Sequence, residues 1–186
     1  MISLKVFLAL TIITGIAYPL LITGVAQIAF PAKANGSLVM KENKVIGSKL
    51  IGQQFDSIIY FSSRPSEVFY NTMPSGGTNY GPTNNQLKQL VIERKSKFIA
   101  FNQLDSHLYI PSEMLFASAS GLDPHISPRA AILQAARVAK ARNFNSNQNL
   151  QLKKLIKELT ETSTFSCLGE ERINVLLLNF ETDGIR

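Results

Sequence analysis

VFLALTIITGIAYPLLITGVAQIAFPA, residues 6–32, contains no Asp, Glu, Lys or Arg, and it is the dominant feature of this sequence. As a helix, these 27 residues would extend about 40 Å. The apolar core of a bilayer is about 30 Å thick and needs about 20 residues to cross it. A helix also satisfies every backbone polar group internally, as lipid requires. The stretch therefore predicts a membrane-spanning helix.

A cleaved signal peptide is the alternative for this stretch. Ala32-Lys33-Ala34 resembles a small-x-small cleavage site, and Lys5 supplies a weak positive start. The apolar region of a signal peptide, however, runs over about 7 to 15 residues, and this one is nearly twice as long. We expect a retained anchor over residues 1–34. The alternative is a secreted binding module released by cleavage after Ala34.

Small residues recur at every fourth position of the predicted span, at Thr11, Gly15, Pro19 and Thr23. Such a stripe lets helix backbones approach closely in lipid, which favours helix association. A lone anchor with incidental small residues remains the alternative. Pro19 clashes with the carbonyl of Gly15, which predicts a kink there.

The remaining residues, 35–186, predict a single compact α+β domain. Residues 35–44 suggest a polar linker, and residues 74–84 form a loop rich in Gly, Pro and Asn. Short strands or turns are expected at Val45–Gln53 and Ile58–Ser63, and a buried strand at Ile173–Phe180. Helices are expected from a Thr83 cap with Gln86 in a capping box to Asn102, from Ser127-Pro128 to Arg142, and over Asn149–Glu161.

The net charge of +6 does not indicate nucleic-acid binding. The basic residues are spread over the predicted helices without a basic arm or a known nucleic-acid motif. Solvated helix faces explain them, with a patch for anionic lipid or an acidic partner as the alternative. The single cysteine, Cys167, excludes an internal disulfide and is expected to be structural.

Motifs of ATP hydrolysis and ion selection are absent from the sequence. Ser75-Gly76-Gly77-Thr78 lacks the Lys-Ser/Thr pair of a phosphate-binding loop. There is no Asp-Lys-Thr-Gly-Thr phosphorylation segment and no Thr-Val-Gly-Tyr-Gly filter. The chain therefore neither carries the phosphorylated aspartate of an ion pump nor selects potassium by itself.

Residues of the hydrolase type occur close together at Ser120, Asp123 and His125. Triad members normally converge from distant parts of a chain, and the G-x-S-x-G elbow is missing. Asp105 and His107 form a second pair, but two histidines without motif spacing do not predict a zinc site. We expect no catalysis and no metal here, only helix caps and turns made by residues such as Asp123, His125 and Ser127.

Eight strings, taken in order, resemble the C chain of the Kdp-type potassium-transporting ATPase family over nearly the whole sequence. Any one of them is weakly specific, but their order is highly specific. They are TGIAYPLLITGVAQ (14–27), FP (30–31), GSKLIGQ (47–53), YFSSRPS (60–66), SGGTNYGPTN (75–84), SGLDPHISP (120–128), RVAKAR (137–142) and NVLLLN (174–179).

The resemblance implies a non-catalytic subunit of a four-chain complex in the bacterial inner membrane. A potassium-selecting A chain, an ATP-hydrolysing B chain and a small F chain would be its partners, so ATP and potassium are used by the complex rather than bound by this chain. The family pattern places the N-terminus in the cytoplasm and the domain in the periplasm. Counting Lys5 against Lys33, Lys41 and Lys44 does not by itself fix this orientation.

The resemblance also implies that the chain raises the ATP affinity of the B chain, which is the reason to consider nucleotide binding. Direct contact of ATP with Gln53 or the Gly76-Gly77 loop would require the opposite topology, so coupling through the membrane helices is the simpler hypothesis. We expect the loops that carry these strings to dock partners or to stabilise the domain. Their candidate residues are Gln53, Arg64, Gly76, Gly77, Asn79, Gly81, Asp123 and His125.

Overall fold

The computed structural model describes residues 1–163 and 168–185, and it divides the chain into two compact units, Met1–Ser48 and Lys49–Arg186. Cys167 lies outside the described residues, so the prediction made for it is untested. The predicted fold class is confirmed, because a long apolar N-terminal helix is followed by a compact mixed α/β domain. The predicted domain boundary between residues 34 and 35 stays a prediction.

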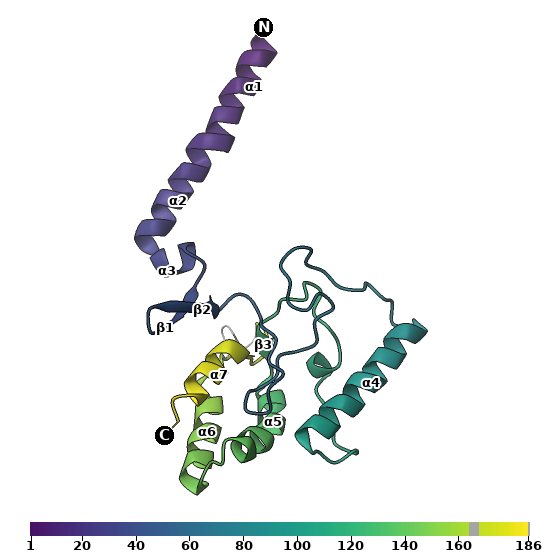
Figure 1. The fold of residues 1–186 in the computed structure, drawn as a ribbon. Helices are drawn as coiled ribbons and strands as arrows, with labels where there is room; N and C mark the ends of the chain where they lie inside the picture. Colours follow the sequence, from purple (N-terminus) through teal and green to yellow (C-terminus); the bar gives the residue numbers. More distant parts are fainter. Residues whose placement is uncertain (164–167, 186) are drawn as a thin grey trace. The chain divides into compact units, whose positions relative to one another are not determined.

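The first unit begins with a continuous helix over Ile2–Ala29 (Figure 1). It consists of α1 (Ile2–Ile12), the π-helical turn η1 (Ile13–Ala17) and α2 (Tyr18–Ala29), and none of its residues is buried. The π turn lies immediately before Pro19, where the sequence predicts a kink. Pro19 has no N–H to donate to Gly15, and a wider turn accommodates its ring. A π turn therefore occurs next to the predicted position, and the kink itself stays a prediction.

A β-hairpin follows the helix, after the single turn α3 (Pro31–Ala34). β1 (Leu38–Lys41) pairs antiparallel with β2 (Lys44–Ser48). Glu42 and Asn43, which join the strands, both have positive φ angles, as the tight turns favoured in hairpins require. The prediction of a polar linker over residues 35–44 is therefore wrong for its second half, because cross-strand pairing recruits residues whose own composition is polar.

In the second unit, α5 (Pro128–Ala141) packs against α4 and α6, and α6 packs against α7. The core collects small residues of α5, including Ala130, Ala131 and Val138, together with Leu152 of α6 and Leu178 of α7. Figure 1 shows α5, α6 and α7 together, with α4 across the long irregular segments. The other elements are α4 (Asn85–Asn102), the 3-10 turn η2 (Ser112–Met114), β3 (His125–Ile126), α6 (Ser146–Glu158), β4 (Ile173–Asn174) and α7 (Val175–Thr182).

The helix starts agree with the predictions to within a few residues. Ser127 caps α5 as predicted, accepting a hydrogen bond from the backbone N–H of Ala130 at 3.1 Å. The predicted Thr83 cap is wrong by one residue, since Asn84 accepts from Gln86 and leaves Gln86 too early for a capping box. α6 starts three residues before the predicted Asn149, because Asn145 and Gln148 form a capping box there.

The predicted buried strand at Ile173–Phe180 is wrong beyond its first two residues. Only Ile173 and Asn174 pair with β3, and the Asn174 side chain then caps α7 by accepting from Leu177 N–H at 3.2 Å. A short apolar run does not distinguish a buried strand from a buried helix. Here the cap made by Asn174 selects the helix, and Val175 and Leu178 remain buried on it.

Side chains from α5 and α7 hold the segment at Phe61 and Ser62, which follows the turn at residues 57–60 and joins no described sheet. Asn179 accepts from the N–H of Phe61 at 2.7 Å and donates to its carbonyl at 2.9 Å. Gln134 does the same for Ser62, at 2.7 and 3.2 Å. Two carboxamides thus replace the neighbouring strand that an extended segment normally needs.

Candidate functional site

The loops that carry the strings quoted above are held to one another in the second unit. The N–H of Gly52 donates to the carbonyl of Leu122 at 2.7 Å. A Cβ on Gly52 would lie 2.8 Å from both the carbonyl oxygen of Asp123 and Cε1 of Tyr70. The chain at residues 52–53 therefore crosses directly against residues 122–123. No residue larger than glycine fits at position 52 of this crossing.

Glycines also join residues 75–77 to residues 118–121. The N–H of Gly76 donates to the carbonyl of Ser120 at 3.0 Å. Gly121 has φ +70°, and a Cβ there would lie 2.5 Å from Cγ2 of Val68 and 3.1 Å from the carbonyl oxygen of Gly76. Gly77 packs beside Ala119, whose carbonyl oxygen would be 3.4 Å from a Cβ. The Gly76-Gly77 loop is thus committed to internal packing, and the Gly76 N–H is not available to a phosphate.

Arg64 and Asp123 form the central ion pair of these loops, with Nη1 of Arg64 at 2.6 Å from Oδ2 of Asp123. Asp123 also accepts from the backbone N–H of His125 at 3.0 Å, and its Oδ1 lies 3.3 Å from Nδ1 of the His125 ring. Burial alone would raise the pKa of Asp123, but the hydrogen bonds from His125 and Arg64 outweigh it and lower that pKa to about 2. Asp123 is therefore a stable anion that holds the two loops together.

Tyr70 holds the backbone of Arg64 by a hydrogen bond. Its hydroxyl donates to the carbonyl of Arg64, and its own N–H donates to Oγ of Ser66 at 3.0 Å. Burial raises the pKa of the Tyr70 hydroxyl to about 12, so the group stays a neutral donor. Ser66 in turn donates to the carbonyl of Gly121 at 2.7 Å. This network fixes the Arg64 segment.

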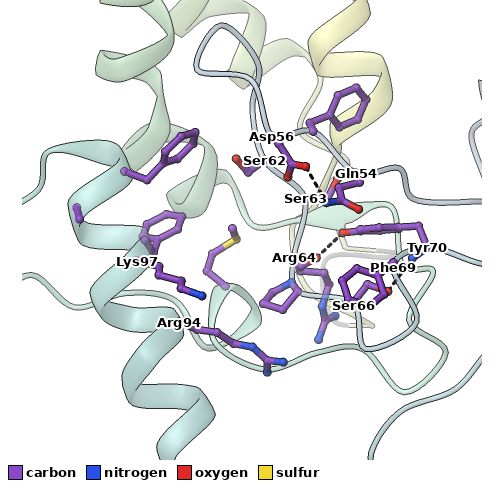
Figure 2. A pocket seen from close by; sticks show the side chains of 16 residues that line it. Gln54, Asp56, Ser62, Ser63, Arg64, Ser66, Phe69, Tyr70, Arg94 and Lys97 are labelled. Carbon is purple, nitrogen blue, oxygen red and sulfur yellow. Dashed lines mark hydrogen bonds between the residues drawn. The ribbon is translucent and has the colours of Figure 1, made fainter.

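A cavity of about 660 Å³ lies between α4 and residues 54–70. Figure 2 shows the side chains of Arg94 and Lys97 extending from α4 toward the segment that carries Arg64. Arg94 pairs with Glu67 and donates to the carbonyl of Leu115 at 3.1 Å, whereas Lys97 is 75% exposed. The wall also includes polar residues such as Gln54 and Ser63, and five aromatic residues: Phe55, Phe69, Tyr70, Phe98 and Phe101.

Arg64 also lines a second cavity of about 590 Å³, together with Asp123, His125 and Glu113. Its Nε is buried and has no hydrogen-bond partner among the described residues. A buried unpaired donor of this kind carries a cost of about 1 to 3 kcal/mol until an acceptor is supplied. Arg64 thus borders both cavities, with Nη1 paired to Asp123 and with Nε buried and unpaired.

The structure brings most of the predicted loop residues together. Gln53 belongs to the same network, since its carbonyl accepts from Oγ of Ser63 at 2.8 Å. Asn79 and Gly81 do not: Asn79 is an exposed residue with φ +53°, and a Cβ on Gly81 would meet nothing within 4 Å. The residues that gather are Gln53, Arg64, Gly76, Gly77, Asp123 and His125.

The hydrolase-like residues serve turns. Ser120 Oγ accepts from the N–H of Leu122 at 3.1 Å, and Asp105 accepts from the N–H of His107 at 2.8 Å. No hydrogen bond joins Ser120 to His125 within residues 1–163 and 168–185. Over the same residues, no group of three or more His, Cys, Asp or Glu side chains could hold a metal ion.

The small-residue stripe lies on the exposed helix of the first unit. Thr11 donates its hydroxyl to the carbonyl of Phe7 at 2.9 Å, so its polar group is satisfied within the helix. In an α-helix, a four-residue repeat drifts around the axis, because four residues exceed one turn of about 3.6. A π turn holds more residues per turn, so η1 reduces this drift between Gly15 and Pro19. The stripe thus stays close to one face.

Sequence reasoning missed several contributors to the network, among them Gly52, Gly121 and Tyr70. Gly52 and Gly121 stand inside quoted strings, so their positions were visible, but the crossings that require glycine were not. Tyr70 lies outside every string, and no local pattern marks it as the donor to Arg64. Only the folded chain brings its hydroxyl to that carbonyl.

Comparison with known proteins connects this geometry to a family. The family model described as KdpC, K+-transporting ATPase, c chain, matches residues 1–184. The potassium-transporting ATPase KdpC subunit of Methylococcus capsulatus is 45% identical over 99% of this chain and 96% of its own length. That of Methylibium petroleiphilum is 46% identical (99% and 96%), and that of Pectobacterium atrosepticum is 45% identical (97% and 94%).

The match begins at residue 1, so it includes the apolar helix and gives no support to the alternative of a secreted module. The eight strings and the helix lie in one continuous match that covers almost every residue. The chain belongs to the family of K+-transporting ATPase c chains, the membrane-anchored KdpC subunits.

Proposed function

We propose that this subunit assembles with a potassium-selecting A chain, an ATP-hydrolysing B chain and a small F chain in the bacterial inner membrane. As a c chain of a transport ATPase it is an accessory subunit, with the catalytic activity in another chain. The N-terminus lies in the cytoplasm and the main domain in the periplasm. The domain stabilises the contact between the A and B chains and meets the A chain near its potassium entrance.

The observation that carries this proposal is the unpartnered helix. None of the 28 residues of Ile2–Ala29 is fully buried, and one face of the helix carries Thr11, Gly15, Pro19 and Thr23. Small residues allow another helix to approach closely, and packing is a main driving force for helix association in lipid. The first role of the helix is therefore assembly, in addition to anchoring.

The interlocked loops supply the second contact. We assign the docking of the A chain to the surface beside Arg64, where Arg94 and Lys97 border the aromatic cavity (Figure 2). Arg64 and Arg94 at this wall are held by Asp123 and Glu67, so the exposed Lys97 is the cation that we expect to meet an acidic loop on the partner. Asn79 and Gly81 lie on an exposed loop outside this cavity, and we propose that loop as a further docking point.

Two matched charge reversals test the docking surface. Lys97→Glu and Lys154→Glu change residues that are 75% and 76% exposed, and each lysine pairs with a glutamate four positions away on its own helix. We expect Lys97→Glu to reduce the A chain recovered with the tagged subunit in mild detergent, and Lys154→Glu to leave it unchanged. Equal recovery with both variants would rule out this surface.

Gly15→Leu tests the helix contact in the same co-purification. A leucine on the stripe prevents close approach, so we expect the other chains to be lost while the anchor still inserts. Ile16→Leu is the control, because it changes shape on a neighbouring helix position without filling the stripe. Recovery of all partners with Gly15→Leu would contradict the proposed role of the stripe.

Coupling through this helix also explains how a periplasmic domain could raise the ATP affinity of the B chain. The loop at Gly76 already donates its N–H to Ser120, which disfavours a phosphate contact there. A smaller change on the stripe tests this coupling in an assembled complex, since a Cβ on Gly15 meets nothing within 4 Å in this chain. We expect Gly15→Ala to leave the complex assembled but to raise its KM for ATP, and Lys154→Glu to leave the KM unchanged. An unchanged KM for Gly15→Ala, with all chains present, would argue against helix coupling.

A further inference from the structure

The length of the apolar helix places its C-terminal end at lipid headgroup level. Its 28 residues extend about 42 Å. The hydrocarbon core is about 30 Å thick, and the bilayer with its headgroup regions is about 40 to 45 Å. A helix of this length therefore matches the whole bilayer, and Ala29 ends within the headgroup region rather than beyond it.

Hydrogen bonds then hold the following chain close to that end. The side chains of Gln27 and Asn35 exchange two hydrogen bonds, at 3.1 and 3.2 Å. The N–H of Ser37 donates to the carbonyl of Ala32 at 2.8 Å. Ser48 Oγ, at the far end of β2, donates to the carbonyl of Gly36 at 2.7 Å. The hairpin is therefore attached to the end of the membrane helix at both of its strands, and it belongs to the same compact unit.

The hairpin presents an apolar face that nothing in its own unit covers. Leu38 and Met40 are two residues apart on β1 and are 50% and 51% exposed, while Val39 between them is buried. Met40 is paired with Val45 of β2, which is 55% exposed. Residues two apart on a strand, and cross-strand partners, share one face of a hairpin. Leu38, Met40 and Val45 therefore form one exposed patch, called here the hairpin patch.

Lysines lie at the tip of the hairpin and in the turn that precedes it. Lys41 and Lys44 are paired at the tip of the hairpin, with Glu42 between them, and Lys33 lies over the ring of Phe30 at 5.8 Å. Lysine stems cover apolar surface while the ammonium groups reach water or phosphate, and anionic lipid attracts such clusters. Strand alternation places Lys41 and Lys44 on the face opposite Met40 and Val45, so the hairpin has one apolar and one basic face. An amphipathic element of this kind suits a membrane interface.

We infer that the hairpin is a second membrane contact, with the hairpin patch resting in the interface of the bilayer and Lys33 and Lys44 contacting lipid phosphates. The lipid is favoured over a protein partner because the hydrogen bonds at Asn35 and Ser48 keep the patch beside the membrane helix. The inference depends on the membrane span alone. It holds whichever side of the membrane the domain occupies and whichever chain docks at Arg64.

The absence of tryptophan from the chain permits a direct test. We would place one tryptophan in the full chain, as Met40→Trp or Val45→Trp, and reconstitute it alone into nanodiscs containing phosphatidylglycerol. Leu150→Trp, on α6 and 65% exposed, is the control in the second unit. Lipids brominated near the headgroup end of the acyl chains would serve as quenchers.

We expect both hairpin tryptophans to be strongly quenched and blue-shifted, and the Leu150→Trp control to be unquenched. Adding Lys44→Glu to Met40→Trp should weaken the quenching in anionic nanodiscs more than in zwitterionic ones. Solvent-exposed spectra from both hairpin positions would overturn the inference. So would a blue shift that appears only when the other ATPase chains are added, since a protein would then cover the patch.

Discussion

The membrane helix and the segment at Phe61 and Ser62 satisfy the same backbone requirement in opposite ways. In Ile2–Ala29 the backbone bonds are made within the helix, and even Thr11 donates to a carbonyl four residues away. Phe61 and Ser62 depend on Asn179 and Gln134, which lie 118 and 72 residues further along the chain. The helix can therefore form as soon as it enters lipid, whereas the segment is ordered only when α5 and α7 are in place.

Asn179→Leu should give the largest loss of stability, because it removes both partners of the Phe61 backbone while keeping the side-chain volume similar. Phe61 is fully buried, so its N–H and carbonyl would be left unpaired. We expect a decrease of about 4 kcal/mol in the free energy of unfolding, from two buried groups. Urea unfolding of the full chain in detergent, followed by circular dichroism, measures it.

Asn147→Leu on the exposed side of α6 is the matched control and should change the unfolding midpoint little. If the two leucine variants unfold at the same urea concentration, the hydrogen bonds from Asn179 to the Phe61 backbone do not stabilise the fold.

Gly121→Ala tests the loop crossing and should come second. The positive φ angle and the 2.5 Å approach of Val68 both oppose a Cβ at this position. We expect a decrease of about 3 kcal/mol, mostly from backbone strain. Gly81→Ala is the control, since a Cβ there meets nothing within 4 Å. The same thermal midpoint for both alanine variants would mean that the crossing adapts to a side chain.

Asp123 should make the stability of the domain depend on acid pH. Its folded pKa is about 2, against 3.8 for the ordinary group, so the folded state binds fewer protons between these values. The contribution is complete above about pH 4, and about 2 kcal/mol is lost as the pH falls toward 2.

Asp123→Asn should reduce this acid-dependent loss when urea midpoints are compared across that pH range. Asp105→Asn, in an exposed turn, should retain the wild-type slope. A wild-type slope in Asp123→Asn would show that this carboxylate, with its hydrogen bonds from His125 and Arg64, is not the source of the pH dependence.

Ser127→Ala is expected to have the smallest of these effects, because a helix cap is a local interaction. Loss of the hydrogen bond from Ala130 should cost about 1 kcal/mol. Ser57→Ala, in an exposed turn, should change stability by less than the error of the measurement. If Ser127→Ala lowered the free energy of unfolding as much as Asn179→Leu does, long-range hydrogen bonds would not contribute more to stability than this local cap.

The sequence alone determined the features that depend on near neighbours. The uncharged run of residues 6–32 requires a membrane helix, Pro19 requires a distortion one turn earlier, and Ser127-Pro128 starts a helix wherever it occurs. In each case the interacting groups lie within a few residues of each other, so a short segment of sequence is enough to predict the interaction. The ordered strings likewise indicated the family before any geometry was known.

The tertiary structure decided how the loops form a site and which apolar run becomes a helix. Gly52 must be glycine because Tyr70 and Asp123 cross it, and Arg64 is fixed by groups as distant as Asp123. The segment Ile173–Phe180 changes from strand to helix at Asn174. The Asn174 side chain caps the helix, and strand pairing does not continue beyond it. These outcomes depend on contacts between residues far apart in the chain, and no local pattern encodes such contacts.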